Sequence, residues 1–320
     1  MNLLKFFCFF LIFFIYSISS FSETISLKRI ESTKIKSKKL FDVKVYELSS
    51  DFEKFGGISG LKIVSPKGIT YPSSQFVFYF LSDEGFYLKA NPQFDQHNNL
   101  KSFNIIDIVP LKSEDNLIIM GDKNEGDAEA IEIYQGDIFI AFERNHRILR
   151  YSKEKKPEHF INPHHLKHLS YNEGIEAIGF IKDQLLIITE DSKASPKSVF
   201  AYLYQNNILR TFYYPLYKDF KPTDLTIINN EEILVLERSY SPYKGNRARI
   251  VNFQYSDIKE GEIVKVKQLV ELEPPFPLDN YEALGNVQLT KQMQKLFIVS
   301  DNNYNPKQRN LLIELNYKNK

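Results

Sequence analysis

The sequence predicts an all-β fold, a β-propeller, on three observations. A short acid-flanked hairpin recurs along the chain. Its opening acids are regularly spaced: 47 residues separate Glu129 from Glu176, 48 separate Glu176 from Asp224, and 58 separate Asp224 from Glu282. Helical periodicity is nearly absent, and the 26 Phe and 19 Tyr residues favour strands. Repeats of roughly 40–50 residues with about four strands each are typical of propeller blades.

Each unit has an acid, an apolar strand, a tight polar turn, a second apolar strand and another acid. The clearest copies run from Asp127 to Arg144 and from Glu173 to Asp191. Five clear units are expected, at 56–83, 127–150, 173–191, 222–238 and 281–301. Outer strands are expected between them, for example Val199–Leu203 with Leu209–Tyr213. The 70 residues between Ser59 and Glu129 are long enough for a degenerate sixth unit.

The two ends of the domain are predicted to close the ring. Phe41–Leu48 alternates apolar and polar residues, as a half-buried strand does. Asn310–Tyr317 is a final strand pattern. Pairing of these two segments within one blade would remove the exposed sheet edges, so the propeller domain is expected to span residues 41–320.

The N-terminus is typical of a secretory signal peptide over residues 1–22. Lys5 precedes the apolar run Phe6–Ile15, and Ser20 and Ser22 provide small residues before a cleavage site near Glu23. An uncleaved membrane anchor is the alternative. Residues 23–40 are expected to form a basic, solvated arm. The leader predicts a secreted protein, and within that class a periplasmic one.

Composition excludes several classes of protein. The one cysteine, Cys8, lies in the leader, so the mature chain would have no disulfide, thiolate metal site or cysteine nucleophile. A net charge of +1 gives no reason to expect nucleic acid as a partner. No stretch after the leader is long and apolar enough to cross a membrane. We expect a monomer with an anionic small molecule as its candidate ligand.

The acids that flank the hairpins are the candidate metal ligands. Equivalent positions of a propeller's inner strands surround one channel, so these acids are expected to form two rings at one of its ends. Clustered carboxylates suit Ca²⁺ or Mg²⁺. Two alternatives remain open: the acids accept backbone hydrogen bonds between blades, or they act directly as acids and bases. The first ring comprises Glu129, Glu176, Asp224 and Glu282, and the second Asp83, Glu143, Glu190, Glu237 and Asp301.

Arginine and histidine supply the other candidates. Arg238 and Arg309 could bind an anionic substrate, or form salt bridges with a neighbouring blade. His146 is the candidate for proton transfer. The cluster of His164, His165 and His168 suggests zinc, but without an HExxH pattern it is better explained as an inter-blade loop. The sequence contains no GxSxG elbow, P-loop or dinucleotide fingerprint.

Three motifs carry a resemblance to a known family. One runs from Asp224 through Leu234–Pro242 to Arg247–Ile250; another joins Asn280–Leu284 to Ile298–Leu312; the third is the repeated Glu-Ala opening. With these motifs the chain resembles the phytase-like family, described by the esterase-like activity of phytase, from about Phe55 onward. The resemblance implies a secreted β-propeller and a phosphoester or ester hydrolase.

Together these patterns predict a secreted, divalent-metal-assisted phosphoester or ester hydrolase with Ca²⁺ as candidate cofactor. The alternative is a non-enzymatic propeller that binds a small ligand or a cell-envelope partner.

Overall fold

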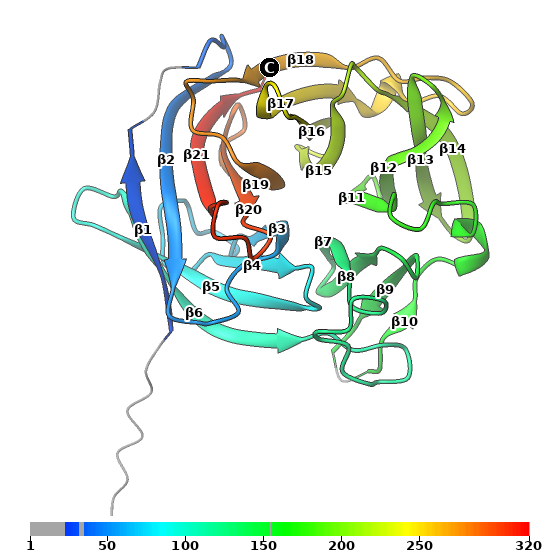
Figure 1. Ribbon diagram of the computed structural model, residues 1–320, viewed down its shortest axis with the longest axis horizontal. Coiled ribbons are helices and arrows are strands. Elements are labelled where there is room, and N and C mark those ends of the chain that lie inside the picture. The colour runs from blue at the N-terminus through cyan, green and yellow to red at the C-terminus, as the bar shows by residue number, and fades with distance from the viewer. Residues whose placement is uncertain (1–22, 32–34, 154, 320) are drawn as a thin grey trace, which may run out of the picture.

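The chain folds into a five-bladed β-propeller around a central channel (Figure 1). The computed structural model describes residues 23–31, 35–153 and 155–319, so the predicted leader, residues 1–22, lies outside the described part. Within that part the only helices are two short 3₁₀ turns, η1 (Pro163–Leu166) and η2 (Tyr255–Asp257). No helix there has the length and apolar character needed to span a membrane. The predicted all-β propeller is therefore confirmed.

Each blade is an antiparallel sheet of four strands, and in Figure 1 the first strand of every blade faces the channel. Blade 1 contains β3 (Ile58–Val64), β4 (Val77–Ser82), β5 (Phe86–Phe94) and β6 (Leu100–Pro110). Blade 2 contains β7 (Ala128–Tyr134), β8 (Asp137–Phe142), β9 (Arg147–Tyr151) and β10 (Glu158–His159). Blade 3 contains β11 (Ile175–Ile181), β12 (Gln184–Ser195), β13 (Ser198–Gln205) and β14 (Ile208–Pro215). Blade 4 contains β15 (Lys221–Ile228), β16 (Glu232–Ser241), β17 (Gly245–Gln254) and β18 (Lys267–Leu272).

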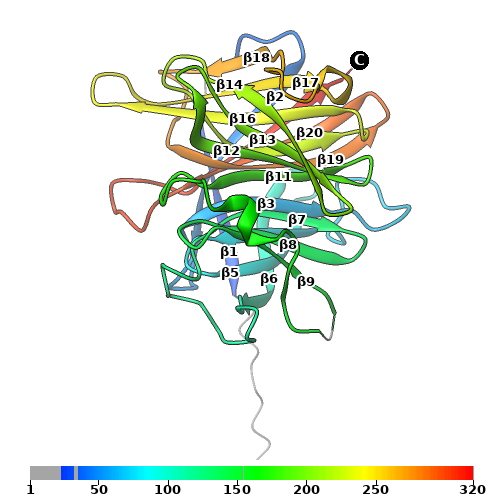
Figure 2. The same ribbon diagram turned by 90° about the vertical axis from the view of Figure 1, so that its right-hand side faces the viewer.

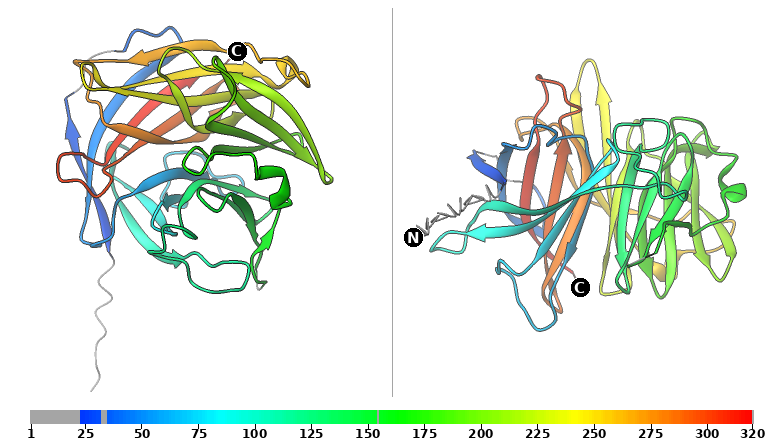
Figure 3. Two further views of the ribbon diagram at one scale, coloured as in Figure 1. Left: turned by 45° about the vertical axis from the view of Figure 1, so that its right-hand side comes forward. Right: turned by 90° about the horizontal axis from the view of Figure 1, so that it is seen from below.

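Blade 5 contains both ends of the propeller domain. It consists of β19 (Asn280–Thr290), β20 (Met293–Asp301), β21 (Leu311–Lys318) and β2 (Leu40–Ser50). In Figure 3, β2 (blue) runs beside β21 (red), and Val45 pairs with Ile313 in the antiparallel register. The predicted closure by N- and C-terminal strands is confirmed.

An additional strand precedes β2 and was not predicted. β1 (Thr24–Ile30) pairs with β2 on one side and with β6 on the other, which joins the outer strands of blades 5 and 1 into one sheet. Part of the expected basic arm, residues 23–40, therefore lies in a sheet. Ile25 of this strand is fully buried, because its side chain packs into the core between the two blades.

The degenerate sixth unit does not exist in the described residues. The long interval between Ser59 and Glu129 contains the remaining strands of blade 1 and a connecting segment, residues 111–127, with one isolated bridge between Lys112 and Ile118. This segment is a loop on the face of the propeller where the acidic residues gather.

The core is divided among the interfaces between blades. Five clusters of buried apolar side chains each join two neighbouring blades. Leu225 and Val235 of blade 4, for example, pack with Ala177 and Leu186 of blade 3. Burying one such aliphatic side chain stabilises the fold by roughly 1.5–3 kcal/mol, so the ring is held together blade by blade.

A β-bulge interrupts the inner strand of every blade at the same place. One residue of the inner strand has no partner in the register with the second strand, while the residues on both sides of it are paired. A bulge redirects a side chain out of the regular alternation. The bulged residues are Ser59, Glu129, Glu176, Thr223 and Glu282.

Candidate functional site

An acidic cavity of about 300 Å³ lies at the end of the channel where the bulges occur. Seven carboxylates and one guanidinium contribute to its wall. Seven of the nine acids predicted to form the two rings are present in it, and they come from blades 1, 2, 3 and 5. The lining residues are Ser59, Asp83, Glu129, Glu143, Asn172, Glu176, Glu190, Arg238, Asn280, Glu282, Asp301 and Asn303.

The bulges supply the inner level of this cavity. Glu129, Glu176 and Glu282 occupy the bulged position of blades 2, 3 and 5 and line the cavity. In blades 1 and 4 the equivalent residue is a hydroxyl that donates to a carbonyl oxygen of the next blade. Ser59 Oγ lies 2.6 Å from Ala128 O, and Thr223 Oγ1 lies 3.3 Å from Tyr281 O.

The ends of the second strands supply an outer level. In each blade the residue before the bulge pairs with a residue of the second strand, and the next residue along that second strand lines the cavity. Four are acids and the fifth, in blade 4, is an arginine. These residues are Asp83, Glu143, Glu190, Arg238 and Asp301.

The prediction for blade 4 was wrong by one residue. Asp224 and Glu237 were assigned to the rings, but the bulge in β15 places Thr223 at the inner position, and Arg238 takes the outer one. A shift of one residue turns a strand side chain to the opposite face. Neither acid is therefore among the residues that line the cavity.

Both displaced acids have structural roles. Asp224 accepts hydrogen bonds from the backbone amides of Leu225, at 2.7 Å, and Leu284, at 2.6 Å. Glu237 is 1% exposed and accepts from Tyr214 Oη at 2.5 Å and from Arg249 Nε. For these two residues the structural alternative, in which the acids serve the scaffold, holds.

Two sides of the cavity are neutralised by cations: Arg238 and Lys221 on one side, Lys123 and Arg144 on the other. Arg238 Nε lies 2.9 Å from Glu282 Oε1, and its Nη2 lies 3.6 Å from Glu190 Oε1. On the other side, Lys123 Nζ lies 2.6 Å from Asp83 Oδ2 and 3.3 Å from Asp127 Oδ1. Lys123 belongs to the 111–127 loop, so this loop brings positive charge to the wall of blade 1.

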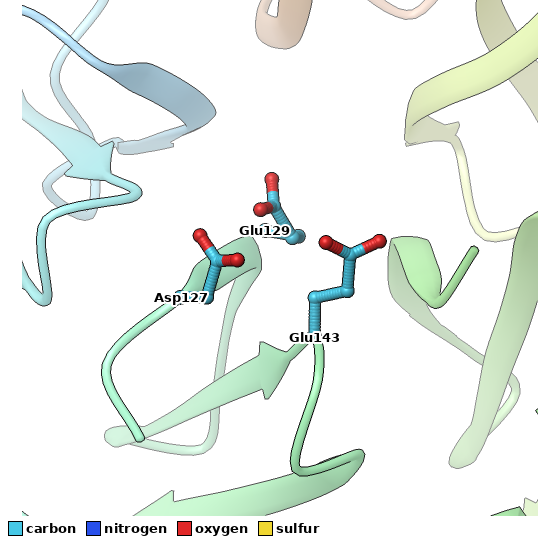
Figure 4. Close-up of side chains that lie close together, drawn as sticks. All are labelled: Asp127, Glu129 and Glu143. Carbon is cyan, nitrogen blue, oxygen red and sulfur yellow. The ribbon is translucent and has the colours of Figure 1, made fainter. Parts of the chain in front are cut away.

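Four cavity acids have no ion-pair partner within the described part of the chain: Glu129, Glu143, Glu176 and Asp301. Asp301 is satisfied by the backbone amides of Ile58 and Asn303, which donate to its Oδ1. Figure 4 shows the side chains of Asp127, Glu129 and Glu143 close together at the end of blade 2. One oxygen from each of these three lies within 4.8 Å of the others. This acidic cluster could hold a metal ion.

Burial and mutual repulsion make these acids reluctant to ionise. Burial, reinforced by neighbouring carboxylates, raises the pKa of Glu129 and of Glu176 well above the usual range. Burial likewise raises the pKa values of Glu143, Glu282 and Asp301 to about 7 in each case. For Glu282, the positive charge of Arg238 opposes this effect. Near neutral pH the cavity would take up either protons or another cation.

The other predicted residues lie outside the cavity. Arg309 is on a loop beside blade 5, where its Nε lies 3.6 Å from Asp279 Oδ2, so the salt-bridge alternative fits it. His146 is held behind the outer level, and its Nε2 donates to the carbonyl oxygen of Ser170 at 2.8 Å. Burial lowers the pKa of His146, which favours the neutral imidazole. His164 and His165 are exposed on η1, in the loop that precedes blade 3.

Sequence reasoning missed residues that the register aligns beside the rings. Asp127 precedes the bulged strand of blade 2 and belongs to the acidic cluster. Asn280 occupies the same position in blade 5, and its Nδ2 donates to Glu282 Oε1 at 2.7 Å. Both residues lie two positions before the bulged residue of their strand, and this shared spacing is the signal that could have identified them. Asn172 and Asn303 come from loops, for which the repeat pattern contains no signal.

The fold and the site define a five-bladed β-propeller with an acidic cavity at the end of its channel. Residues 53–304 match the family named phytase-like, with the description "Esterase-like activity of phytase". The match covers most of the chain, so the protein belongs to the phytase-like family, as the motifs around blades 4 and 5 suggested.

Other comparisons found only distant similarity. A search of the curated proteins gave no match. A protein of unknown function from Dyadobacter fermentans aligns with a TM-score of 0.43 and 10% identity, over 92% of this chain and 98% of that chain. The extracellular domains 1–2 of Drosophila semaphorin 1b align with a TM-score of 0.34 and 12% identity, over 78% of this chain and 52% of that chain.

Proposed function

We propose that this phytase-like propeller binds a divalent cation in the acidic cavity and, so loaded, hydrolyses a phosphoester or an ester. The observation that carries the proposal is the convergence of Glu129, Glu143 and Glu176 in one cavity, each without an ion-pair partner among the described residues. Carboxylate oxygens of Glu129 and Glu143 also lie within 4.8 Å of each other and of an Asp127 oxygen. Membership of the phytase-like family supports the reaction class.

These residues fit a hard cation. Glu176 is only 9% exposed, lines the cavity and has no hydrogen-bond donor among the described residues. Two carboxylates 4–5 Å apart repel by roughly 3–4 kcal/mol at an effective dielectric constant of about 20. A cation held by several carboxylate oxygens removes this repulsion, and oxygen ligands are those that Ca²⁺ and Mg²⁺ prefer. We therefore assign Glu129, Glu143 and Glu176 as the ligand carboxylates.

The chain's own residues would bind the substrate and move the proton. A bound divalent cation supplies Lewis-acid polarisation and a more acidic water. Arg238 presents the one guanidinium of the cavity wall and would orient an anionic group. Glu282 lies beside it with a pKa of about 7, so it can hold or release a proton at neutral pH.

A second candidate function is cation or small-ligand binding without catalysis. It is favoured by the position of His146 and Arg309, since neither of these predicted catalytic residues lines the cavity. In addition, Arg238 is already paired with Glu282 and Glu190, which reduces its capacity to bind a substrate anion.

The test combines melting with an assay. The purified protein is melted with CaCl₂ and with chelator, and turnover of a phosphomonoester such as p-nitrophenyl phosphate is measured in both. We expect Ca²⁺ to raise Tm and to support turnover, and Glu143→Gln/Glu176→Gln to lose both effects. Glu262→Gln is the matched control, because Glu262 is an exposed acid that pairs with Lys259 and is not among the residues that line the cavity. A Ca²⁺-dependent Tm without turnover supports the binding function, and no Ca²⁺ effect at all contradicts cation binding and with it the metal-dependent hydrolase.

We also propose that the protein acts after secretion, in the periplasm. The apolar run Phe6–Ile15 and the small residues Ser20 and Ser22 support this location. N-terminal sequencing of the protein from a periplasmic extract should begin near Glu23, and recovery of the intact leader in the membrane fraction would favour the anchor instead.

A further inference from the structure

The outer level of the cavity contains one exception to its chemistry. Four blades place an acid at the outer level, and blade 4 places Arg238 there. Its guanidinium lies between carboxylates of the blades on either side, at 3.6 Å from Glu190 of blade 3 and 2.9 Å from Glu282 of blade 5. The arginine therefore occupies the space where two acids would otherwise face each other.

Charge is distributed unevenly around the cavity as a result. Lys123 pairs with Asp83 and, together with Arg144, with Asp127. Arg238 pairs with Glu282 and, together with Lys221, with Glu190. Of the cavity acids without an ion pair, Glu129, Glu143 and Glu176 lie in blades 2 and 3. The fourth, Asp301 of blade 5, accepts hydrogen bonds from the backbone amides of Ile58 and Asn303. Glu176 is the acid with no donor described and nine-tenths burial, so it is the residue that most requires an external cation.

We infer that Arg238 substitutes for a second divalent cation and thereby limits the cavity to one, at Glu129, Glu143 and Glu176. This inference rests on the proposed cation site. Removal of the guanidinium would leave Glu282 without a counter-ion, and the neighbouring Glu190 with only Lys221, whose Nζ lies 3.7 Å from Glu190 Oε2. Both would then offer oxygens to a new cation, and Asp301, whose charge already acts on Glu282, lies near enough to contribute.

Arginine is suited to this role because its charge is permanent. A guanidinium stays protonated throughout the accessible pH range, whereas a bound Ca²⁺ dissociates when its concentration falls. The blade 4 side of the cavity therefore keeps its neutralising charge in the absence of metal. Only the blade 2 and blade 3 side would respond to the cation, which gives the site one responsive half and one fixed half.

Calorimetric titration with CaCl₂ tests this assignment. The wild-type protein and Arg238→Lys, which keeps the charge, should each bind about one Ca²⁺ per chain, and Arg238→Gln should bind about two. The triple variant Arg238→Gln/Glu190→Gln/Glu282→Gln should return to about one. Arg309→Gln is the matched control, because Arg309 lies outside the cavity, and it should bind as the wild type does.

The outcomes separate the inference from the function on which it rests. If Arg238→Gln binds the same number of Ca²⁺ ions as the wild type with the same affinity, the inference is overturned. If the wild type binds none and Arg238→Gln binds one, Arg238 does replace a cation but the proposed cation site fails. If Arg238→Gln is unfolded without metal, CaCl₂ should restore its melting transition, and failure to do so also overturns the inference.

Discussion

Asp224 Oδ2 accepts a 2.6 Å hydrogen bond from the backbone amide of Leu284, and this contact joins the inner strands of blades 4 and 5. The other oxygen of the same carboxylate accepts from the amide of Leu225. Asp224 is thus a carboxylate whose two oxygens are satisfied by the backbone, in contrast to Glu176 in the cavity.

This contrast predicts opposite effects of two similar substitutions. Asp224→Asn replaces one acceptor oxygen with an amide that cannot accept from Leu284, and should destabilise the fold by about 1–3 kcal/mol. Glu176→Gln removes one of several repelling charges, so the metal-free protein should keep or gain stability at pH 8. Urea unfolding measures both. Equal losses of stability in the two variants would contradict the assignment of different roles.

The pKa values of the cavity acids predict an unusual pH dependence. Burial raises the pKa values of Glu282 and Asp301 to about 7 in the folded chain, against about 4 in the unfolded one. The folded state then binds more protons than the unfolded state between these values, so the free energy of unfolding falls as pH rises from about 4 to 7. The contribution of these acids to Tm, measured in chelator, should fall as pH rises across this range, and the fall should be smaller in Glu282→Gln. A slope as steep in Glu282→Gln as in the wild type would contradict a raised pKa of Glu282 in the folded chain.

Gly57 is required where the outer level meets blade 1. Its φ of +59° is in the left-handed region, and an added Cβ would lie 2.1 Å from Asp83 Oδ1 and 2.8 Å from a ring carbon of Tyr304. We expect Gly57→Ala to lower stability by more than the roughly 1–2 kcal/mol that a left-handed alanine costs. Gly68→Ala is the control, since Gly68 has a φ of +79° but nothing within 4 Å of an added Cβ. Similar unfolding midpoints for the two variants would contradict this expectation, because they would show that the side chains of Asp83 and Tyr304 move away from the added Cβ at little cost in stability.

The pair of Glu237 and Arg249 stabilises blade 4 and does not serve the cavity. Both side chains are almost fully buried, at 1% and 3% exposure, and Arg249 also stacks on Tyr217 and Phe220. Removing one partner leaves a buried charge, so Glu237→Leu should cost about 3–5 kcal/mol. The double variant Glu237→Leu/Arg249→Met should recover much of that loss. Chemical denaturation of both variants tests the pair, and a double variant no more stable than the single one would contradict it.

Much of the architecture followed from the repeat spacing. Five hairpins at regular intervals predicted five blades, and the alternation in Phe41–Leu48 predicted the closing strand. β1 was not predicted, because its residues form a strand only through pairing with β2 and β6, which come from different blades. Figure 2 shows that the hairpin of β16 and β17 (yellow) and the segment after β20 (red) project on the same side of the molecule. The repeat pattern did not predict this either.

The cavity was predicted to within one register error. A usable signal was present in blade 4: Thr223-Asp224-Leu225 aligns with Glu176-Ala177-Ile178 if the apolar third residue is kept in place. Asp224 then stands where other blades have alanine or glycine, and Thr223 takes the bulge. Aligning the acids of blade 4 with those of the other blades shifted its register by one position. Glu237 was therefore assigned to the outer level in place of Arg238.

The sequence by itself determined the fold class, the closure of the ring and the gathering of acids at one end of its channel, because these follow from local periodicity and repeat length. Only the tertiary structure decided which acids face the cavity and which cations neutralise them. A bulge shifts side-chain direction by one residue, and the partners Lys123 and Arg238 reach their acids across blades. Such contacts depend on how blades meet in space, which no spacing within a blade contains.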